Sequence, residues 1–152
     1  MDIVSGASYP ASSLSNFAPH AFFFDGVECV CAEGPLQSFK FEDEEAQREI
    51  CSLSGREAKK RGRKRNNAWR MAQCLWWKGV AYTREGPEYQ KLLDALYDAL
   101  FTNIDFRNAL VLTGNEVLRH SIGHQDQKMT VLTEEELCSR LMKLRDRLLL
   151  CP

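Results

Sequence analysis

The amino-acid sequence predicts an α+β fold: a mainly helical single domain over residues 1–152, with a small antiparallel hairpin near the N-terminus. The hairpin is predicted by Asp25-Gly26, a strong two-residue turn signal between two apolar runs at residues 21–24 and 27–32. The helices are predicted by start signals and by apolar residues at helical spacing, which recur after residue 33. With 152 residues, 44% of them hydrophobic, the chain can bury the core of one ordinary domain.

The first expected helix follows the hairpin directly. Gly34 breaks the extended run, and the fixed φ of Pro35 suits a first helical position. Glu33, Gln37 and Lys40 are four and three residues apart, so they share one face of this helix. A face that combines a carboxylate, an amide and a cation is either a solvated surface or a site, and spacing alone does not separate the two.

Further helices are predicted by their start signals. Two capping boxes, Ser54 with Glu57 and Thr133 with Glu136, mark two of these starts. Residues 115–131 are expected to form a loop. The helices are expected over residues 43–51, from Ser54 onward, from Gly86-Pro87 to residue 100, over about residues 105–112, and from Thr133 onward.

Composition argues against several classes of protein. The formal net charge of −1 does not suit a general nucleic-acid coat or a membrane-surface protein. There is no run of about 18 apolar residues and no charged-then-apolar leader, so we expect an intracellular, cytoplasmic protein. The six cysteines are expected to be reduced, and the three histidines are too scattered for a zinc signature. Because glycine-rich phosphate loops are also missing, no metal or other cofactor is expected.

A basic run occupies residues 56–65, where seven of ten residues are cations. Seven cations cannot share one face of a helix, so part of the run must be solvated surface. Arg56 and Lys59 lie three apart near the free backbone N–H groups of a helix start, where a phosphate-bearing ligand can bind. The alternatives are a solubilising patch and a localisation signal.

Five segments form a pattern in order along nearly the whole chain: Leu14-Ser15-Asn16-Phe17, the hairpin with Asp25-Gly26, Glu33-x-x-x-Gln37-x-x-Lys40-Phe41, Ser54-Gly55-Arg56-Glu57-Ala58-Lys59 with Gly62-Arg63, and Leu112-Thr113-Gly114. This pattern resembles the NADAR domain family, which was named for a predicted link to NAD and ADP-ribose. Its studied members include enzymes that cleave N-glycosidic bonds. Some act on phosphorylated ribosylamino-pyrimidine intermediates of riboflavin biosynthesis, and others remove ADP-ribose from modified guanine. The resemblance therefore implies a hydrolase, an N-glycosidase.

Cleavage of a ribosyl C–N bond passes through an oxocarbenium-like state, which needs a carboxylate and groups that hold the departing base. Glu33 is the expected carboxylate. Asp126 is a candidate for the second one, although a loop aspartate is often only a turn residue, and His120 is the alternative acid–base group. The expected substrate-binding residues are Asn16 and Gln37 for a base edge or a ribose hydroxyl, Lys40 for a phosphate or the leaving group, Arg56, Lys59 and Arg63 for phosphate, and Trp77 for stacking on the heterocycle.

The chain departs from the family pattern at two places. Many members carry an aromatic residue or a histidine after the motif glutamate, where this chain has Gly34-Pro35. The segment His120-Ser121-Ile122-Gly123 stands where common bacterial members have an acidic residue and an aromatic-glycine pair. These differences indicate another branch of the family.

Two alternatives to a hydrolase stay open at this point. One is a non-catalytic reader of ADP-ribose or a related nucleotide, which would use the same amide and cations without turnover. The other is a nucleic-acid-binding protein built on residues 56–65. The expected partner is a small nucleotide-like substrate or an ADP-ribosylated nucleic acid, with no membrane involved and with the oligomeric state unknown.

Overall fold

The Asp25-Gly26 turn joins two antiparallel strands, as predicted. Phe22 pairs with Cys29 and Phe24 with Val27. Both turn residues have positive φ values, 49° and 79°, which a tight hairpin with right-handed twist requires.

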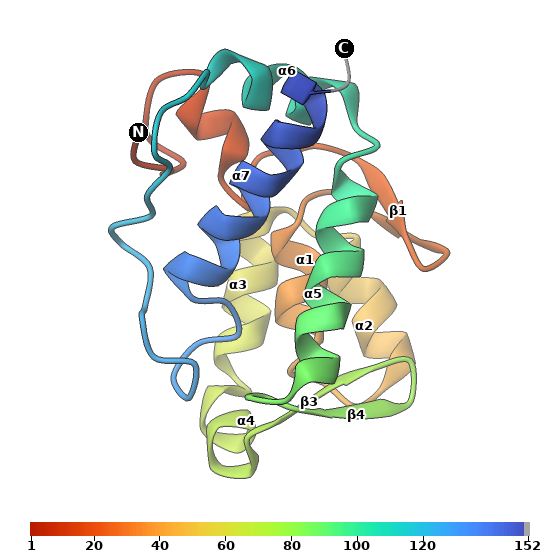
Figure 1. Ribbon diagram of the computed structural model, residues 1–152. Helices are drawn as coiled ribbons and strands as arrows, with labels where there is room; N and C mark the ends of the chain where they lie inside the picture. The colour runs from red at the N-terminus through yellow and green to blue at the C-terminus, as the bar shows by residue number, and fades with distance from the viewer. Residues whose placement is uncertain (151–152) are drawn as a thin grey trace.

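The computed structural model describes residues 1–150 (Figure 1). Within this range the chain forms seven α-helices, one short 3₁₀-helix and two small antiparallel sheets, which confirms the α+β fold class. The elements are η1 (Ala11–Leu14), β1 (Phe22–Phe24), β2 (Val27–Cys29), α1 (Glu33–Ser38), α2 (Glu44–Cys51), α3 (Gly55–Arg63), α4 (Asn66–Ala72), β3 (Cys74–Trp77), β4 (Val80–Thr83), α5 (Pro87–Leu100), α6 (Ile104–Leu112) and α7 (Glu134–Leu150).

Helices α2, α3, α5, α6 and α7 begin within one residue of their predicted starts, whereas α1 begins at Glu33, two residues before Pro35, where its start was expected. Ser54 accepts a hydrogen bond at 3.3 Å from the backbone N–H of Glu57 at the start of α3. Thr133 and Glu136 exchange two hydrogen bonds, at 2.8 and 3.1 Å, and so form the capping box of α7. Pro87 is the first residue of α5. The local sequence therefore determines these helix ends.

The stretch between residues 66 and 83 forms elements that no start signal in the sequence predicted. Asn66-Asn67 ends the basic run and begins α4, and Lys78-Gly79 is the turn of a second hairpin, β3–β4. Both turn residues have positive φ values, which lysine rarely adopts. The backbone N–H of Lys78 donates to Oε1 of Gln47, and its ammonium group donates to the backbone oxygen of Asp25. These tertiary contacts hold a turn that the local sequence does not specify.

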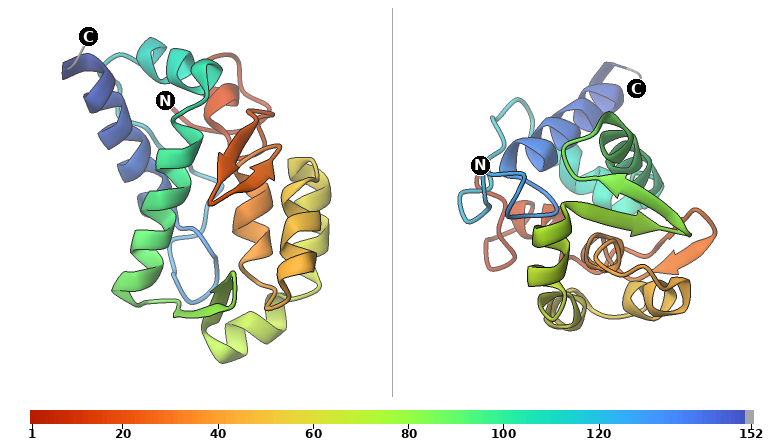
Figure 2. Two further views of the ribbon diagram at one scale, coloured as in Figure 1. Left: turned by 90° about the vertical axis from the view of Figure 1, so that its right-hand side faces the viewer. Right: turned by 90° about the horizontal axis from the view of Figure 1, so that it is seen from below.

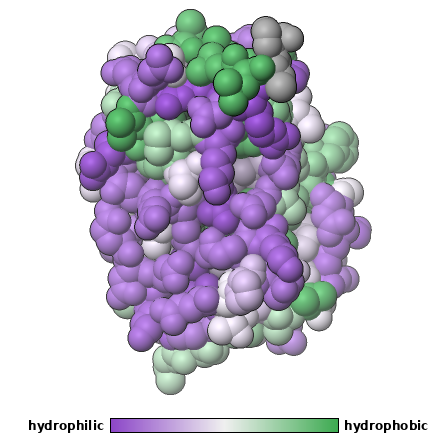
Figure 3. Space-filling model, in the orientation of Figure 1, coloured by the Kyte–Doolittle hydropathy of each residue, from purple (hydrophilic) through white to green (hydrophobic). Residues whose placement is uncertain are grey.

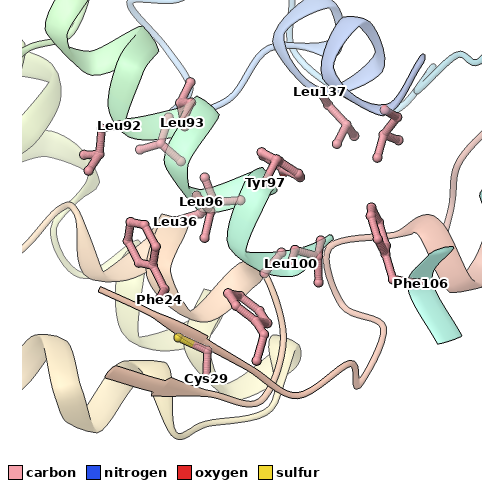
Figure 4. Close-up of a cluster of buried hydrophobic side chains, with 14 of the residues drawn as sticks. Phe24, Cys29, Leu36, Leu92, Leu93, Leu96, Tyr97, Leu100, Phe106 and Leu137 are labelled. Carbon is pink, nitrogen blue, oxygen red and sulfur yellow. The ribbon is translucent and has the colours of Figure 1, made fainter. Parts of the chain in front are cut away.

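Helix α1 lies between α2 and α3 and contacts both (Figure 1). Helix α5 contacts β1 and α7, so the main core forms between the α1 group and the α5–α7 pair. Figure 4 shows side chains of this core, with Leu36 of α1 close to Leu96 of α5 and with Tyr97 on the same helix. The N-terminal end of α1 is therefore held between two packed layers.

The two ends of the molecule have different surfaces. Helix α4 and the β3–β4 hairpin lie at one end, and α6 lies at the other with the last turns of α7 (Figure 2). Exposed apolar side chains gather at the α6 end, including Val111, Leu112 and Leu149, whereas the face that carries α3, α5 and α7 is mostly hydrophilic (Figure 3).

Two further properties concern the described residues alone. Across residues 1–150, no helix combines the length and the apolar composition needed to cross a membrane. The five cysteines in this range are free thiols. Cys151, the sixth, lies outside the described residues.

Candidate functional site

Helix α1 is almost completely buried because glycines let its neighbours approach closely. A Cβ atom on Gly34 would lie 3.0 Å from Cα of Cys51 in α2. A Cβ atom on Gly62 of α3 would lie 1.7 Å from Oε1 of Gln37. Neither position leaves room for a side chain, so the two glycines fix α1, and the polar groups at its start, against α2 and α3.

A cavity of about 370 Å³ opens at the polar face of α1. Its walls are residues 15–17, α1, the facing sides of α3 and α4, and the loop at residues 120–132. The volume is within the range of small-molecule sites. Seven of the predicted site residues line it: Asn16, Glu33, Gln37, Lys40, Lys59, Arg63 and His120.

Glu33 is the one carboxylate in the lining of this cavity, as far as residues 1–150 show. Its Oε1 accepts a hydrogen bond at 2.8 Å from Nε2 of Gln37, and no donor within the described chain is paired with its Oε2. Burial raises the pKa of Glu33, and the hydrogen bond from Gln37 and the positive charges of Lys59 and Lys40 oppose this rise without cancelling it. The site therefore favours the protonated form of Glu33 more than water does.

Lys40 lines the same cavity as Glu33 and is only 6% exposed. Burial lowers the pKa of Lys40 to about 8, although the negative charge of Glu33 acts in the opposite direction. Its ammonium group donates to Oδ1 of Asn66 at 2.6 Å. A cation with few partners is thus available to a phosphate or to a negatively charged leaving group.

His120 enters the cavity wall from the loop. Its Nδ1 lies 2.6 Å from the backbone oxygen of Ile3. Because a carbonyl oxygen can only accept, Nδ1 carries the hydrogen of the neutral ring, and Nε2 is the nitrogen left for other partners. Gly123 makes room for the ring, since a Cβ atom there would lie 2.6 Å from Cδ2 of His120.

Asn16 is tied to two other elements. Its backbone oxygen accepts the N–H of Glu33 at 3.0 Å. Its side-chain Oδ1 accepts the hydroxyl of Tyr97, a buried residue of α5, at 2.7 Å. The amide of Asn16 and the carboxylate of Glu33 therefore belong to one connected framework.

The loop that closes the cavity has no regular structure, but its backbone is anchored at four consecutive carbonyl oxygens. Each accepts a side-chain hydrogen bond from the end of α4, from β3–β4 or from α5. The donors are Gln73 to Lys128 at 2.9 Å, Arg70 to Met129 at 2.8 Å, Arg84 to Thr130 at 2.8 Å and Tyr89 to Val131 at 2.6 Å. These bonds hold the loop without using its own side chains.

Three predicted site residues do not line the cavity. Arg56 is exposed in the first turn of α3, outside the lining. Asp126 lines a separate cavity near the start of α7, and its carboxylate accepts the N–H of Lys128 as an ordinary turn residue does. Trp77 lies in the core, where its ring stacks on Phe24 at 4.8 Å, so no face of the indole is free for a heterocycle.

The cavity also contains residues that the sequence did not single out. Asn66 directly follows the basic run, and its side chain lines the cavity and accepts from Lys40. Phe17 and Trp69 are aromatic side chains of the lining, and Arg70 adds a further cation. Tyr97 was hidden within a helical apolar stripe, where a tyrosine looks like core. Within residues 1–150, no group of histidine, cysteine, aspartate and glutamate side chains is arranged to bind a metal ion.

Comparisons with known proteins agree with this fold. The model of the bacteriophage protein GP30.3 family matches residues 8–146. An uncharacterised 17.1 kDa protein in the Gp30–rIII intergenic region of Enterobacteria phage T4 is 38% identical over 150 residues, which span 97% of this chain and 98% of the phage protein. The NMR structure of the E. coli protein YbiA is similar over 99% of this chain and 84% of its own length, with a TM-score of 0.65 and 20% identity. At this identity the likeness concerns the fold alone.

Proposed function

We propose that this chain, which belongs to the bacteriophage protein GP30.3 family, is a hydrolase that cleaves the N-glycosidic bond of a ribosylated heterocycle. The candidate substrates are those that the NADAR resemblance implies: a phosphorylated ribosylamino-pyrimidine, as in riboflavin biosynthesis, or an ADP-ribosylated guanine. The expected products are the free base and a ribose phosphate or ADP-ribose.

The environment of Glu33 carries the proposal. Its carboxylate lines a ligand-sized cavity, its pKa is raised by burial, and its Oε2 has no donor within residues 1–150. A raised pKa brings a carboxyl group closer to the pH at which it can take up and return a proton.

In the proposed reaction the C1′–N bond breaks as the ribose gains oxocarbenium character, and water adds to C1′. Glu33 stabilises the positive charge of the sugar and takes a proton from the water. The departing nitrogen of the heterocycle takes up a proton, and the proposed donor is Nε2 of His120 in its imidazolium form. The proton that Glu33 takes from the water then passes to solvent, and His120 takes up a proton again before the next turnover. Lys40 balances negative charge on the leaving group or on a phosphate.

The remaining lining residues are assigned to binding. Lys59 and Arg63 are exposed cations at the rim of the cavity, where they suit the phosphate groups of the substrate. The side-chain amide of Gln37 donates a hydrogen bond to Glu33, so the proposed role of Gln37 is to orient that carboxylate. Phe17, which is partly exposed, replaces Trp77 as the proposed aromatic surface for the heterocycle, whereas Trp69 is fully buried.

One observation favours a second candidate function, a non-catalytic reader of ADP-ribose or a related nucleotide. Most glycoside hydrolases use two carboxylates, whereas Glu33 is alone in the described lining and Asp126 lies elsewhere. A reader would need the cations and the amide but no acid–base pair.

The test is incubation of the purified protein with a ribosylamino-pyrimidine phosphate and, separately, with ADP-ribosylated guanosine, followed by mass detection of the released base. Glu33→Gln is compared with Glu45→Gln, a matched control on the exposed side of α2. We expect release by the wild type and the control, and a loss of about 10²- to 10⁴-fold for Glu33→Gln. Binding of ADP-ribose to Glu33→Gln should stay within a few-fold of the wild type.

Each result separates the two functions. Release by the wild type that depends on Glu33 establishes the hydrolase and selects its substrate. Saturable ADP-ribose binding without release from either substrate supports the reader. Equal release by the wild type and Glu33→Gln contradicts the proposed role of Glu33.

A further inference from the structure

We propose that Tyr97 is a positioning residue that holds the side chain of Asn16 in one orientation, so that Asn16 offers the cavity a hydrogen-bond donor. The ligand must then present an acceptor at this place. This inference rests on the proposed function, because it assigns the chemistry of one contact in that same cavity.

The hydrogen bond between the two side chains fixes the amide. Tyr97 is 1% exposed, and burial raises its pKa well above the usual value of 10, so its hydroxyl keeps its proton. Within residues 1–150 this proton has no acceptor other than Oδ1 of Asn16, so a flipped amide would leave a buried hydroxyl hydrogen unpaired. Oδ1 of Asn16 accepts this bond at 2.7 Å. The opposite branch of the planar amide is Nδ2, which has no acceptor within residues 1–150 and is not sealed away from solvent. Since Asn16 lines the cavity, Nδ2 is the branch left for a ligand.

Both partners are held rigidly. The ring of Tyr97 is packed in the core on α5, where Figure 4 shows it among leucine side chains. The backbone oxygen of Asn16 accepts the N–H of Glu33 at 3.0 Å, so the donor has a fixed place relative to the proposed catalytic carboxylate. Without Tyr97, rotation of the amide by 180° would exchange a nitrogen and an oxygen of nearly equal size, and the donor would no longer be specified.

The consequence is a rule for the ligand. A carbonyl oxygen, a ring nitrogen with a lone pair, a hydroxyl oxygen or a phosphate oxygen can accept from Nδ2. If the ligand placed an amino group here, it would be a second donor facing Nδ2 of Asn16. Neither donor would have an acceptor, which is unfavourable for binding. Tyr97 therefore contributes to specificity although it touches no substrate.

A double-mutant cycle tests the inference. Tyr97→Phe removes only the hydroxyl, and Asn16→Ala removes the amide on which it acts. We expect Tyr97→Phe to lower kcat/KM about tenfold in the wild-type background, which corresponds to the loss of one hydrogen bond. In the Asn16→Ala background the same change should have less than a twofold effect, because there is no amide left to orient. A purely structural role would instead lower kcat/KM by the same factor in both backgrounds.

Asn16→Asp is a second variant that keeps the acceptor for Tyr97 and thus the local fold. Because an aspartate offers only acceptors at neutral pH, its kcat/KM should fall at least as far as that of Asn16→Ala. Full activity of Asn16→Asp, unchanged activity of Tyr97→Phe, or equal losses in the two backgrounds would overturn the inference.

Failure of the inference about Tyr97 can be distinguished from failure of the proposed hydrolase function. If the wild type binds ADP-ribose without hydrolysis, the hydrolase proposal fails, and the same cycle is measured in the Kd for ADP-ribose. If the wild type neither releases base nor binds ADP-ribose, both proposals fail. If the wild type is active and the cycle is additive, only the role of Tyr97 is refuted.

Discussion

Glu33 and Glu136 both lie in the first turn of a helix and both are largely out of contact with solvent, but their pKa values move in opposite directions. Burial acts to raise the pKa of Glu136, yet hydrogen bonds from Arg84, Gln90 and the backbone of Thr133 outweigh it and lower the pKa to about 2. Glu33 receives one side-chain hydrogen bond, and burial raises its pKa.

The difference lies in how completely each carboxylate is satisfied. Glu136 is surrounded by donors and bridges Arg84, which is fully buried, at 2.7 Å. It fastens the start of α7 to β4 and is a structural group. Glu33 keeps an oxygen free in a cavity, which works against folding and makes the group available to a ligand. The number of donors, more than burial, therefore separates the structural carboxylate of Glu136 from the proposed catalytic carboxylate of Glu33.

Of the variants that test this comparison, Glu136→Gln is expected to change the free energy of unfolding most. The change leaves the charge of Arg84 buried without its partner, so the free energy of unfolding at pH 7 should fall by about 3 kcal/mol. Chemical denaturation of the wild type and of Glu135→Gln, an exposed neighbour, provides the measurement and its control.

The same variant gives a pH dependence with a defined sign. The folded pKa of Glu136 is about 2, below its ordinary value of 4.5, so the stability it contributes is complete above pH 4.5 and is lost as the pH falls towards 2. The difference in the free energy of unfolding between the wild type and Glu136→Gln should therefore become smaller as the pH falls from 4.5 towards 2. A gap that stayed constant down to pH 2 would show that the charge is not what stabilises the chain.

A smaller effect of opposite sign is expected from Glu33→Gln. Because the folded state raises the pKa of Glu33 above 4.5, ionisation opposes folding, and this penalty grows as the pH rises from 4.5 through the raised pKa. The uncharged variant should therefore be more stable than the wild type by about 0.5–2 kcal/mol at pH 8, and equally stable near pH 3. Thermal unfolding at both pH values measures this, and a less stable variant at pH 8 would break the comparison.

The smallest effect is expected from Asp126→Asn, which removes a third carboxylate that is exposed and lies outside the cavity. Its stability should stay within about 0.5 kcal/mol of the wild type, and base release should stay within about twofold. A tenfold loss of base release would return Asp126 to the role of second catalytic carboxylate.

The sequence was informative wherever a few adjacent residues decide the structure. Asp25-Gly26 and the two capping boxes are such cases, because turn and cap preferences are properties of the local chain. The shared face of Glu33, Gln37 and Lys40 also followed from helical spacing, and all three line the cavity.

The sequence was uninformative where distant segments decide. Trp77 resembles a stacking residue until the strand that carries it is placed against Phe24. The Lys78-Gly79 turn depends on Gln47, and the Tyr97 contact with Asn16 joins residues 81 positions apart. Such contacts have no signature in one sequence, since they depend on how separate elements pack.

The anchoring of the loop through four backbone carbonyls has a consequence for how this family can diversify. Every residue carries a backbone carbonyl oxygen, so substitutions at residues 128–131 that keep the backbone conformation preserve the acceptors that Arg70, Gln73, Arg84 and Tyr89 require. The outer wall of the cavity can thus change its side chains, and with them the ligands it admits, while the path of the backbone stays constant. This loop can therefore tolerate substitutions and still keep a defined backbone conformation, because the side chains that donate the hydrogen bonds lie outside the loop.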